Sequence, residues 1–553
     1  MKNNNLKNIL WGFLIFLPIA TYFYFLSEYA INIPKWDDHA LKAFILDFFN
    51  ADNIIVKIQT LFKQHNEHRI AFDRFFTLAV FWIHGSIEYR WLMWIGNFSL
   101  IGVLLIFYKI FQKQKLSLAF FVPIPLILFQ LQLWENTFWG MAALQNFGIV
   151  FFILGLIYFI SSDKKNYFYL ALFFAFCATY TSGNGITAFP ICIVLLVLQR
   201  RFRDAIIFGV ISATLSFLYF YHYQMPPSNP PMVGIGIGKI ILGFFSFLGS
   251  VFDLIPSSSG RIKLTIIFGI VIFIASAIIA IYLIFSSSLL NKRSKLNQSQ
   301  LFILGSFMFL IGTGIVVTYT RISFGEIGLL TSRYKIYSIL LLITLYLVVI
   351  SKLDLNNLKW AAFPIILIPI CFNCVANYIN FKEVDNFRNQ LISFGINWEL
   401  EPKQVINTSI IKLHEAPKLI NENSVAALEN PVLTAPVWGE KIVKTVNANG
   451  YFIQNTTLKL PKSKDIGIFM VAQSSKRTYI IPSQLMNYPL KTFVKTGNYW
   501  QNGFVAELNN NEFENGNYQL GIWIREGLNG KIYSLEDSII VQNIKPRNVK
   551  TNW

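Results

Sequence analysis

The sequence predicts an α-helical polytopic membrane protein followed by a soluble, β-sandwich-like domain. Three observations support this fold class. Only 14% of the 553 residues are charged, against about 25% in soluble domains. Residues 1–380 contain repeated apolar runs of roughly 17–23 residues, the length that crosses about 30 Å of hydrocarbon as a helix. From about residue 431 onward, short segments rich in β-branched and aromatic residues alternate with turns.

The apolar runs of the first region predict about eleven transmembrane helices. We place them at 9–29, 91–111, 117–134, 145–161, 167–182, 186–199, 205–223, 264–286, 301–318, 334–350 and 360–380. One further apolar run, "KIILGFFSFLGSVFDLIP" (239–256), is either another span or a helix that lies on the membrane surface.

Basic loops decide between these two readings of 239–256. Cytoplasmic loops are enriched in Lys and Arg, and short basic loops occur at 113–115, 163–165, 200–203 and 291–295. All four fall on the side of the basic N-terminus only if 239–256 does not cross. We therefore expect 239–256 not to span, the N-terminus to be cytoplasmic and the C-terminal domain to lie outside.

This topology divides the chain into a transmembrane domain (1–380), a helical or irregular linker (381–430) and an outer β-sandwich-like domain (431–553). The first outer loop is long (31–90). Its stretches 38–50 and 52–63 have apolar residues at helical spacing, a pattern typical of amphipathic helices on a bilayer.

The formal net charge of +18 does not indicate nucleic-acid binding. Part of it is the positive-inside bias, the rest is dispersed, and no basic stripe with interleaved aromatic residues occurs. Membrane lipids, through anionic headgroups or a lipid phosphate, are better partners for this charge.

Two adjacent carboxylates follow the first span in "IPKWDDHALK" (33–42). One carboxylate at a helix start caps backbone N–H groups, but capping does not require both. We expect one of Asp37 and Asp38 to act as a general base or metal ligand and the other to cap or orient, with a slight preference for Asp37 as the base.

The other outer loops are also unusually polar. They are "QHNEHRIAFDR" (64–74), "WENTFWGMAALQNFG" (134–148), "YTSGNGI" (180–186) and "YTRISFGEIGLLTSRYK" (319–335). Charged groups at membrane depth are costly and mark sites or pathways, so we expect these loops to converge on one ligand site. The candidate binding residues are His65, Glu67, His68, Arg69, Glu135, Asn136, Gln145, Asn184, Arg321, Arg333 and Tyr334.

These residue types suit a lipid-phosphate-linked sugar. Arginine can bind two phosphate oxygens at once, and a carboxylate can take the proton of an acceptor hydroxyl while the phosphate leaves. A divalent cation (Mg²⁺ or Mn²⁺), held by Asp37 or Asp38, would help to neutralise that phosphate. The HxxH spacing of His65 and His68, without further ligands, is a weak zinc signal.

One span, a long outer loop that opens on "WDDHA" and a return through "NEHRI" together resemble the GT-C glycosyltransferases. "WENTFWGMAALQNFG", "YTSGNGI" and "TSRYK" are similar to segments of bacterial GT-C-type membrane proteins of surface polysaccharide synthesis. The resemblance covers roughly 1–380. It implies a catalytic acid in the first outer loop, here Asp37 or Asp38. It also implies inverting transfer from an undecaprenyl-phosphate sugar to a hydroxyl of a glycan or lipid at the outer face of the bacterial cytoplasmic membrane.

Two other functions stay open. A flippase or transporter of a lipid-linked saccharide would carry charges deep within its spans and internal repeats. An O-antigen polymerase or ligase would depend on arginines of large outer loops without an acid pair near the first span.

Overall fold

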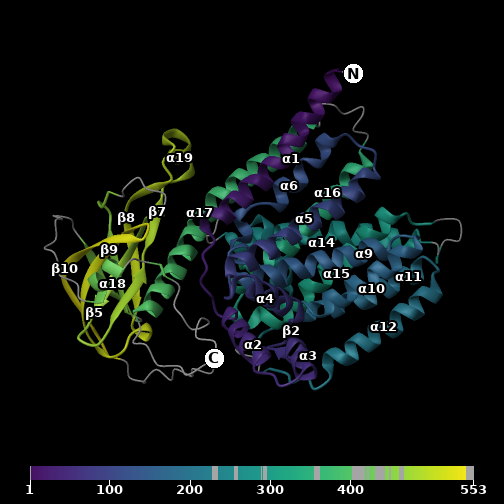
Figure 1. The fold of residues 1–553 in the computed structure, drawn as a ribbon. Coiled ribbons are helices and arrows are strands. Elements are labelled where there is room, and N and C mark those ends of the chain that lie inside the picture. Colours follow the sequence, from purple (N-terminus) through teal and green to yellow (C-terminus); the bar gives the residue numbers. More distant parts are fainter. Residues whose placement is uncertain are drawn as a thin grey trace. The chain divides into compact units, whose positions relative to one another are not determined.

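The computed structural model describes residues 2–226, 234–254, 260–287, 289–290, 295–353, 362–400, 418–419, 422–429, 442–447, 450–459 and 466–542. The chain forms two compact units (Figure 1). The helical unit comprises residues 1–28 and 40–380, and the C-terminal unit comprises residues 29–39 and 381–553. Residues 29–39 therefore fold with the end of the chain rather than with the loop that follows them.

Helices dominate the first unit. Its longer helices are α1 (Lys2–Tyr29), α5 (Tyr89–Gln112), α9 (Gly148–Ile160), α10 (Lys165–Thr179), α11 (Ala188–Leu198), α12 (Phe202–Phe220), α14 (Arg261–Phe285), α15 (Gln298–Arg321), α16 (Lys335–Lys352) and α17 (Ala362–Glu399). The first outer loop contains α2 (Asp38–Phe49), α3 (Ile54–Phe62) and α4 (Ala71–His84).

Within the described residues, nine helical segments are long and apolar enough to cross a membrane. They are Lys7–Tyr29, Tyr89–Gln112, Leu118–Thr137, Gly140–Ile160, Phe202–Phe220, Arg261–Phe285, Gln298–Phe324, Ser332–Lys352 and Phe363–Glu399. The expected spans at 167–182 and 186–199 form the shorter helices α10 and α11, of 15 and 11 residues. The helices indicate a multi-pass membrane protein, with nine span-length helices in place of the eleven expected.

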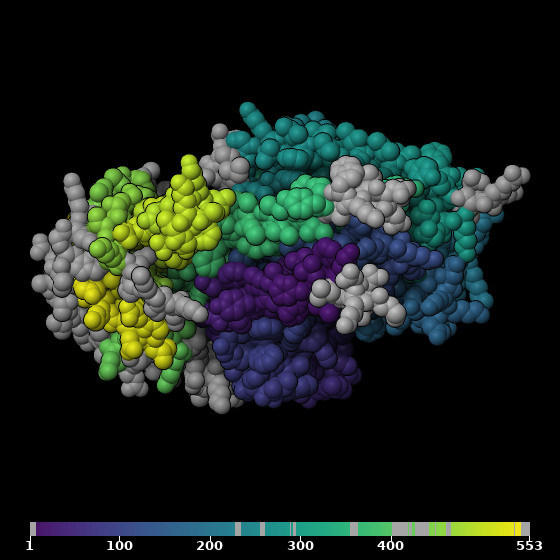
Figure 2. All heavy atoms as spheres, turned by 90° about the horizontal axis from the view of Figure 1, so that it is seen from above, coloured from purple at the N-terminus to yellow at the C-terminus, as the bar shows by residue number. Residues whose placement is uncertain are grey.

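The N-terminal helix α1 lies at the surface of the helical unit, where Figure 2 shows it in purple. Its apolar side chains point outward, among them Ile9, Phe13 and Phe16, which are 57–68% exposed. An apolar surface of this kind is suited to lipid contact.

In its described part, which ends at Leu254, the run 239–256 forms no span-length helix; that it does not cross the membrane stays a prediction. Helix α13 (Ile237–Leu248) has 12 residues, about 18 Å of helix, and a short 3₁₀ turn, η5 (Ser250–Phe252), follows it. The chain then reaches Asp253, which contacts Arg261 and Lys335 at the first turns of α14 and α16.

The four basic loops gather at one end of the helical unit. Lys113 hydrogen-bonds Gln298 at the start of α15, and Lys295 forms an ion pair with Asp163 (2.8 Å). Arg201 donates to the carbonyl oxygen just before Asp163 (2.8 Å). The described residues of these loops therefore lie close together; that they face the cytoplasm stays a prediction.

The segment 118–137 is not a single regular helix. It consists of η1 (Leu118–Phe121), α6 (Pro123–Leu128), η2 (Leu131–Leu133) and α7 (Trp134–Thr137). Pro123 and Pro125 lack the N–H group that a continuing helix would need. A π-helical turn, η3 (Ala143–Phe147), follows, and such turns occur often at functional sites.

The C-terminal unit contains two four-stranded antiparallel sheets. One sheet has the order β10 (Asn529–Val541), β9 (Gly516–Glu526), β5 (Ile466–Gln473), β6 (Thr478–Pro482). The other has the order β3 (Val443–Asn447), β4 (Gly450–Asn455), β8 (Trp500–Asn509), β7 (Gln484–Asn487). One core, which includes Ile453 and Phe504 from one sheet and Met470 and Ile522 from the other, joins them. This is the two-layer arrangement that the strand pattern predicts.

The helix α17 continues without interruption from the helical unit into the C-terminal unit. Its residues Ile392 and Ile396 are buried against Phe469 and Trp523 on the outer face of the β5–β9 sheet. The short helices of this unit are α18 (Glu422–Glu429) and α19 (Leu490–Thr496). Most of the expected linker 381–430 beyond residue 400 lies outside the described residues.

Candidate functional site

A two-stranded hairpin presents the first acidic residue of the site. Strands β1 (Gln64–His65) and β2 (His68–Arg69) pair across a turn, in which Asn66 adopts a left-handed conformation (φ 47°), one that Asn tolerates. The Glu67 carboxylate binds Arg321, at the end of α15, at 2.6 Å. Both side chains are more than one third exposed.

Burial and nearby charges have opposite effects on the pKa of Glu67. Burial raises its pKa, but a backbone hydrogen bond and the charges of His68 and Arg321 lower it more, so the pKa of Glu67 lies below its ordinary value. Glu67 is therefore ionised at neutral pH.

The Gly-rich segment 180–186 lies against the same hairpin. The Gly183 N–H donates to Nδ1 of His68 (3.2 Å). The Asn184 amide donates to the hydroxyl oxygens of Thr313 (3.2 Å) and Tyr337 (3.5 Å). The segment thus connects the hairpin to α15 and α16.

A second ion pair forms between Arg333 and Glu135, with 3.3 Å between Nε and Oε1. The Glu135 side chain is 10% exposed and that of Arg333 is 32% exposed. The Arg333 guanidinium also lies 5.6 Å from the ring centre of Trp139. The Asn136 amide donates to the Arg333 carbonyl oxygen (3.0 Å), which fixes the backbone that carries the arginine.

The two ion pairs belong to one network. Arg321 interacts electrostatically with Tyr334, and the Tyr334 ring centre lies 6.0 Å from the Arg333 guanidinium. The Gln145 amide, in the π-helical turn, donates to the Thr181 carbonyl oxygen (3.5 Å). The four polar loops are therefore in contact with one another, and the ligand site stays a prediction. We call these residues the arginine network: Glu67, His68, Glu135, Asn136, Gln145, Asn184, Arg321, Arg333 and Tyr334.

Arg69 has a different role from the expected phosphate contact. Its Nε donates to the Tyr219 carbonyl oxygen (2.6 Å), Nη1 to that of Phe62 (2.6 Å) and Nη2 to that of Tyr221 (2.5 Å). All three guanidinium nitrogens are thus engaged with backbone, and Arg69 ties the hairpin to the end of α12. His65, on the same hairpin, lies beside the Asn66 amide (3.3 Å).

Asp37 and Asp38 belong to the C-terminal unit. Asp38 is fully buried, and its carboxylate accepts the Lys35 N–H (3.0 Å). It closes the turn at the start of α2, where Trp36 has φ 44°. This contact holds the turn that precedes α2, and the capping of α2 itself stays a prediction. Asp37 is half-buried.

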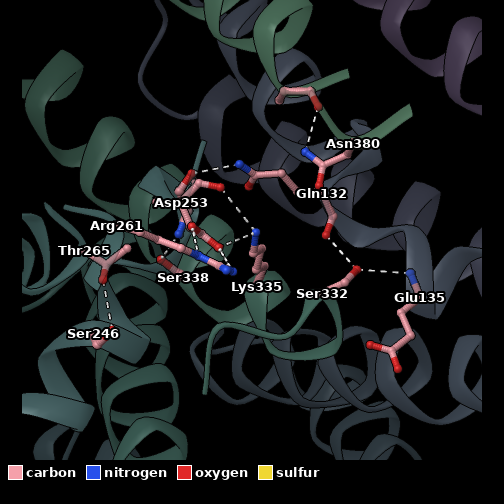
Figure 3. Close-up of polar contacts among 12 residues, drawn as sticks. Gln132, Glu135, Ser246, Asp253, Arg261, Thr265, Ser332, Lys335, Ser338 and Asn380 are labelled. Atoms are coloured by element: carbon pink, nitrogen blue, oxygen red, sulfur yellow. Dashed lines mark hydrogen bonds and ion pairs between the residues drawn. The ribbon is translucent and has the colours of Figure 1, made fainter. Parts of the chain in front are cut away.

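Three charged residues that the sequence did not single out form a buried triad (Figure 3). The Asp253 carboxylate receives two hydrogen bonds from Arg261 (2.5 and 2.7 Å) and one ion pair from Lys335 (3.0 Å). The Asp253 and Lys335 side chains are 0% and 6% exposed. The sequence signal was slight: an Asp at the end of 239–256 and the Lys of "TSRYK".

The triad adjoins the arginine network along the chain, because Lys335 follows Arg333 and Tyr334 directly. Ser332, at the start of this segment, donates to the Gln132 carbonyl oxygen (2.7 Å) and accepts the Glu135 N–H (3.1 Å), as Figure 3 shows. Buried contacts on both sides therefore fix the segment that carries Arg333.

In the described part of the chain, no group of three His, Cys, Asp or Glu side chains is arranged to hold a metal ion. The Asp38 carboxylate is also engaged with backbone, so we derive no step through a cation. Comparisons of the chain with protein-family models, with curated proteins and with solved structures find no match.

Proposed function

We propose that this protein is a GT-C-like membrane glycosyltransferase of the bacterial cytoplasmic membrane. It transfers a sugar, with inversion, from a polyprenyl-phosphate donor to a hydroxyl of a glycan or lipid acceptor at the outer face. The N-terminus is then cytoplasmic, and the C-terminal unit lies outside.

The observation that carries this proposal is the arginine network. Arg321 and Arg333 lie next to the ends of candidate spans and are 37% and 32% exposed, each with one carboxylate partner. In the described residues, no hydrogen bond is recorded from the terminal nitrogens of Arg333. A partly exposed guanidinium at membrane-interface depth is suited to a lipid phosphate.

In the proposed reaction, the acceptor oxygen attacks the anomeric carbon of the donor sugar. The bond from that carbon to the phosphate oxygen breaks, and polyprenyl phosphate leaves. A carboxylate takes the acceptor proton. We assign this role to Asp37, because Asp38 is buried and occupied by the Lys35 N–H.

The test uses the purified full-length protein in lipid vesicles with a mixture of radiolabelled polyprenyl-phosphate sugars, with EDTA or with Mg²⁺ and Mn²⁺. We compare wild type with Asp37→Asn, Asp38→Asn and Arg333→Gln. Asp47→Asn is the matched control, since Asp47 is a half-exposed carboxylate of the same outer loop, paired with Lys63. We expect Asp37→Asn to lose transfer, Arg333→Gln to raise the donor KM and Asp47→Asn to transfer like wild type.

Full transfer by both Asp37→Asn and Asp38→Asn would remove the acid pair from the mechanism and direct the search to Glu67 and Glu135. No transfer with any donor would contradict the transferase. Flipping of a labelled lipid-linked saccharide by the same vesicles would then support a transporter.

A further inference from the structure

The helix α19 of the C-terminal unit has no buried residue. It projects beyond the ends of β7 and β8 in Figure 1. Leu490 and Val494, one turn apart, are 40% and 75% exposed. Lys491 and Lys495 form the adjacent exposed row, and no ion pair of either lysine is recorded among the described residues. An exposed apolar row beside a basic row is typical of a helix that lies in a membrane interface.

The lengths of two uncharged stretches predict where the chain leaves the membrane. Residues 8–27 form a stretch of 20 residues without a charge, and residues 363–381 a stretch of 19. At 1.5 Å per residue each covers about 30 Å, the thickness of the hydrocarbon core. The two candidate spans α1 and α17 therefore reach the interface close to Tyr29 and Phe381.

These two exit points meet in the C-terminal unit. The Tyr29 and Phe381 rings lie 5.5 Å apart between centres. The uncharged stretches of α1 and α17, each counted separately along the sequence, therefore end at the same place in the C-terminal unit, and this place marks the expected membrane interface.

An aromatic cluster joins this level to α19. Phe381 contacts Tyr499 (4.9 Å) and Trp500 (5.7 Å), and Tyr499 contacts Phe493 of α19 (5.9 Å between ring centres). The Lys382 N–H also donates to the Tyr499 hydroxyl (3.1 Å). Tyr and Trp are enriched at membrane interfaces because their rings are amphipathic.

We propose that α19 docks the C-terminal unit on the bilayer: Leu490 and Val494 enter the headgroup region, and Lys491 and Lys495 bind the phosphates of anionic lipids. The occupant is a lipid surface because the helix adjoins the points where two spans leave the hydrocarbon. Its basic row complements an anionic surface. The proposal does not depend on the transferase activity.

The test places a nitroxide label at single cysteines of the full-length protein after replacement of Cys177, Cys192, Cys371 and Cys374. One label replaces Val494. The matched control label replaces Val446, which is 74% exposed and lies in the β3–β4 hairpin, beside the other end of β8. The protein is reconstituted in vesicles of phosphatidylcholine, with or without phosphatidylglycerol. Accessibility to oxygen, which partitions into lipid, is compared with accessibility to a water-soluble nickel chelate.

We expect the label at 494 to favour oxygen and the label at 446 to favour nickel, with a larger contrast in phosphatidylglycerol. Lys491→Gln and Lys495→Gln should each lower the ratio of docked to undocked protein about fivefold in anionic vesicles. Equal nickel access at both positions would overturn the proposal. Protection of the 494 label from both reagents would also overturn it, because a protein partner would then cover α19.

Discussion

The buried triad allows a sharp test, in which Asp253→Asn removes one charge and keeps the side-chain shape. In wild type, one carboxylate without solvent exposure faces two cations, Arg261 (20% exposed) and Lys335 (6% exposed). The substitution leaves those two cations against each other without an anion. Breaking a buried pair in this way costs about 3–5 kcal/mol. The partial exposure of Arg261 places the expected loss near the lower end of that range.

Two further variants separate this effect from a general sensitivity to mutation. Lys335→Met removes the excess positive charge and leaves the bidentate Asp253–Arg261 pair intact, so it should cost less than Asp253→Asn. Asp47→Asn breaks the exposed pair with Lys63, which is worth about 0–1 kcal/mol. The assay is the free energy of unfolding of each purified protein in mixed micelles with increasing denaturing detergent.

The reasoning would be refuted by an Asp253→Asn protein that unfolds at the same detergent fraction as Asp47→Asn. A loss in Lys335→Met as large as that in Asp253→Asn would also contradict it. The side chains of Asp253 and Lys335 would then stabilise the fold through packing, and the excess positive charge would have no measurable effect on stability.

Four other substitutions, one of them with a matched control, test separate parts of the structure. Glu67→Gln should lower the melting temperature at neutral pH but not in acid. Because the pKa of Glu67 is depressed, its stabilising effect is present above the ordinary value of 4.5 and is lost as the pH falls through the lowered pKa; melting curves of both proteins from neutral to acid pH test this. Arg69→Lys should lose about 1–3 kcal/mol of stability, since an ammonium group cannot span three carbonyl oxygens. Arg333→Lys should instead raise the donor KM and keep stability, as unfolding and transfer assays would show. Gly269→Ala should destabilise α14, because its Cβ would lie 1.8 Å from a backbone oxygen of α13, whereas Gly312→Ala, with nothing within 4 Å, should unfold like wild type.

The sequence predicted those features that depend on local pattern and on the alternating direction of spans. Apolar run length located nine span-length helical segments, and the alternation of the spans predicted that the polar loops would meet. The contact between Glu67 and Arg321, 254 residues apart, follows from that alternation. The strand pattern after residue 431 likewise predicted two facing sheets.

Contacts between residues that lie far apart in the sequence could not be predicted in this way. Arg69 and Arg333 are equally basic in the sequence, but two of the three carbonyl oxygens that occupy Arg69 come from residues about 150 positions away. Asp253 and Lys335 are separated by 82 positions. The segment 118–137 has the length of a span, yet it is divided into short helices; Pro123 lies at the first of these breaks, and the extended backbone of Gln130 forms the next.

The place of residues 29–39 has a consequence for the acid pair. Ile33 is 1% exposed and packs at Gly395, where an added Cβ would lie 3.0 Å from it. The Lys35 amine lies 3.9 Å from the ring centre of Phe387. The second half of α17 thus packs against the turn that carries Asp37. A chain that ends at residue 380 would lose residues 381–399 of α17 and with them the packing of Ile33 and the contact between Lys35 and Phe387, so we expect the conformation of the Asp37 turn to depend on the second half of α17.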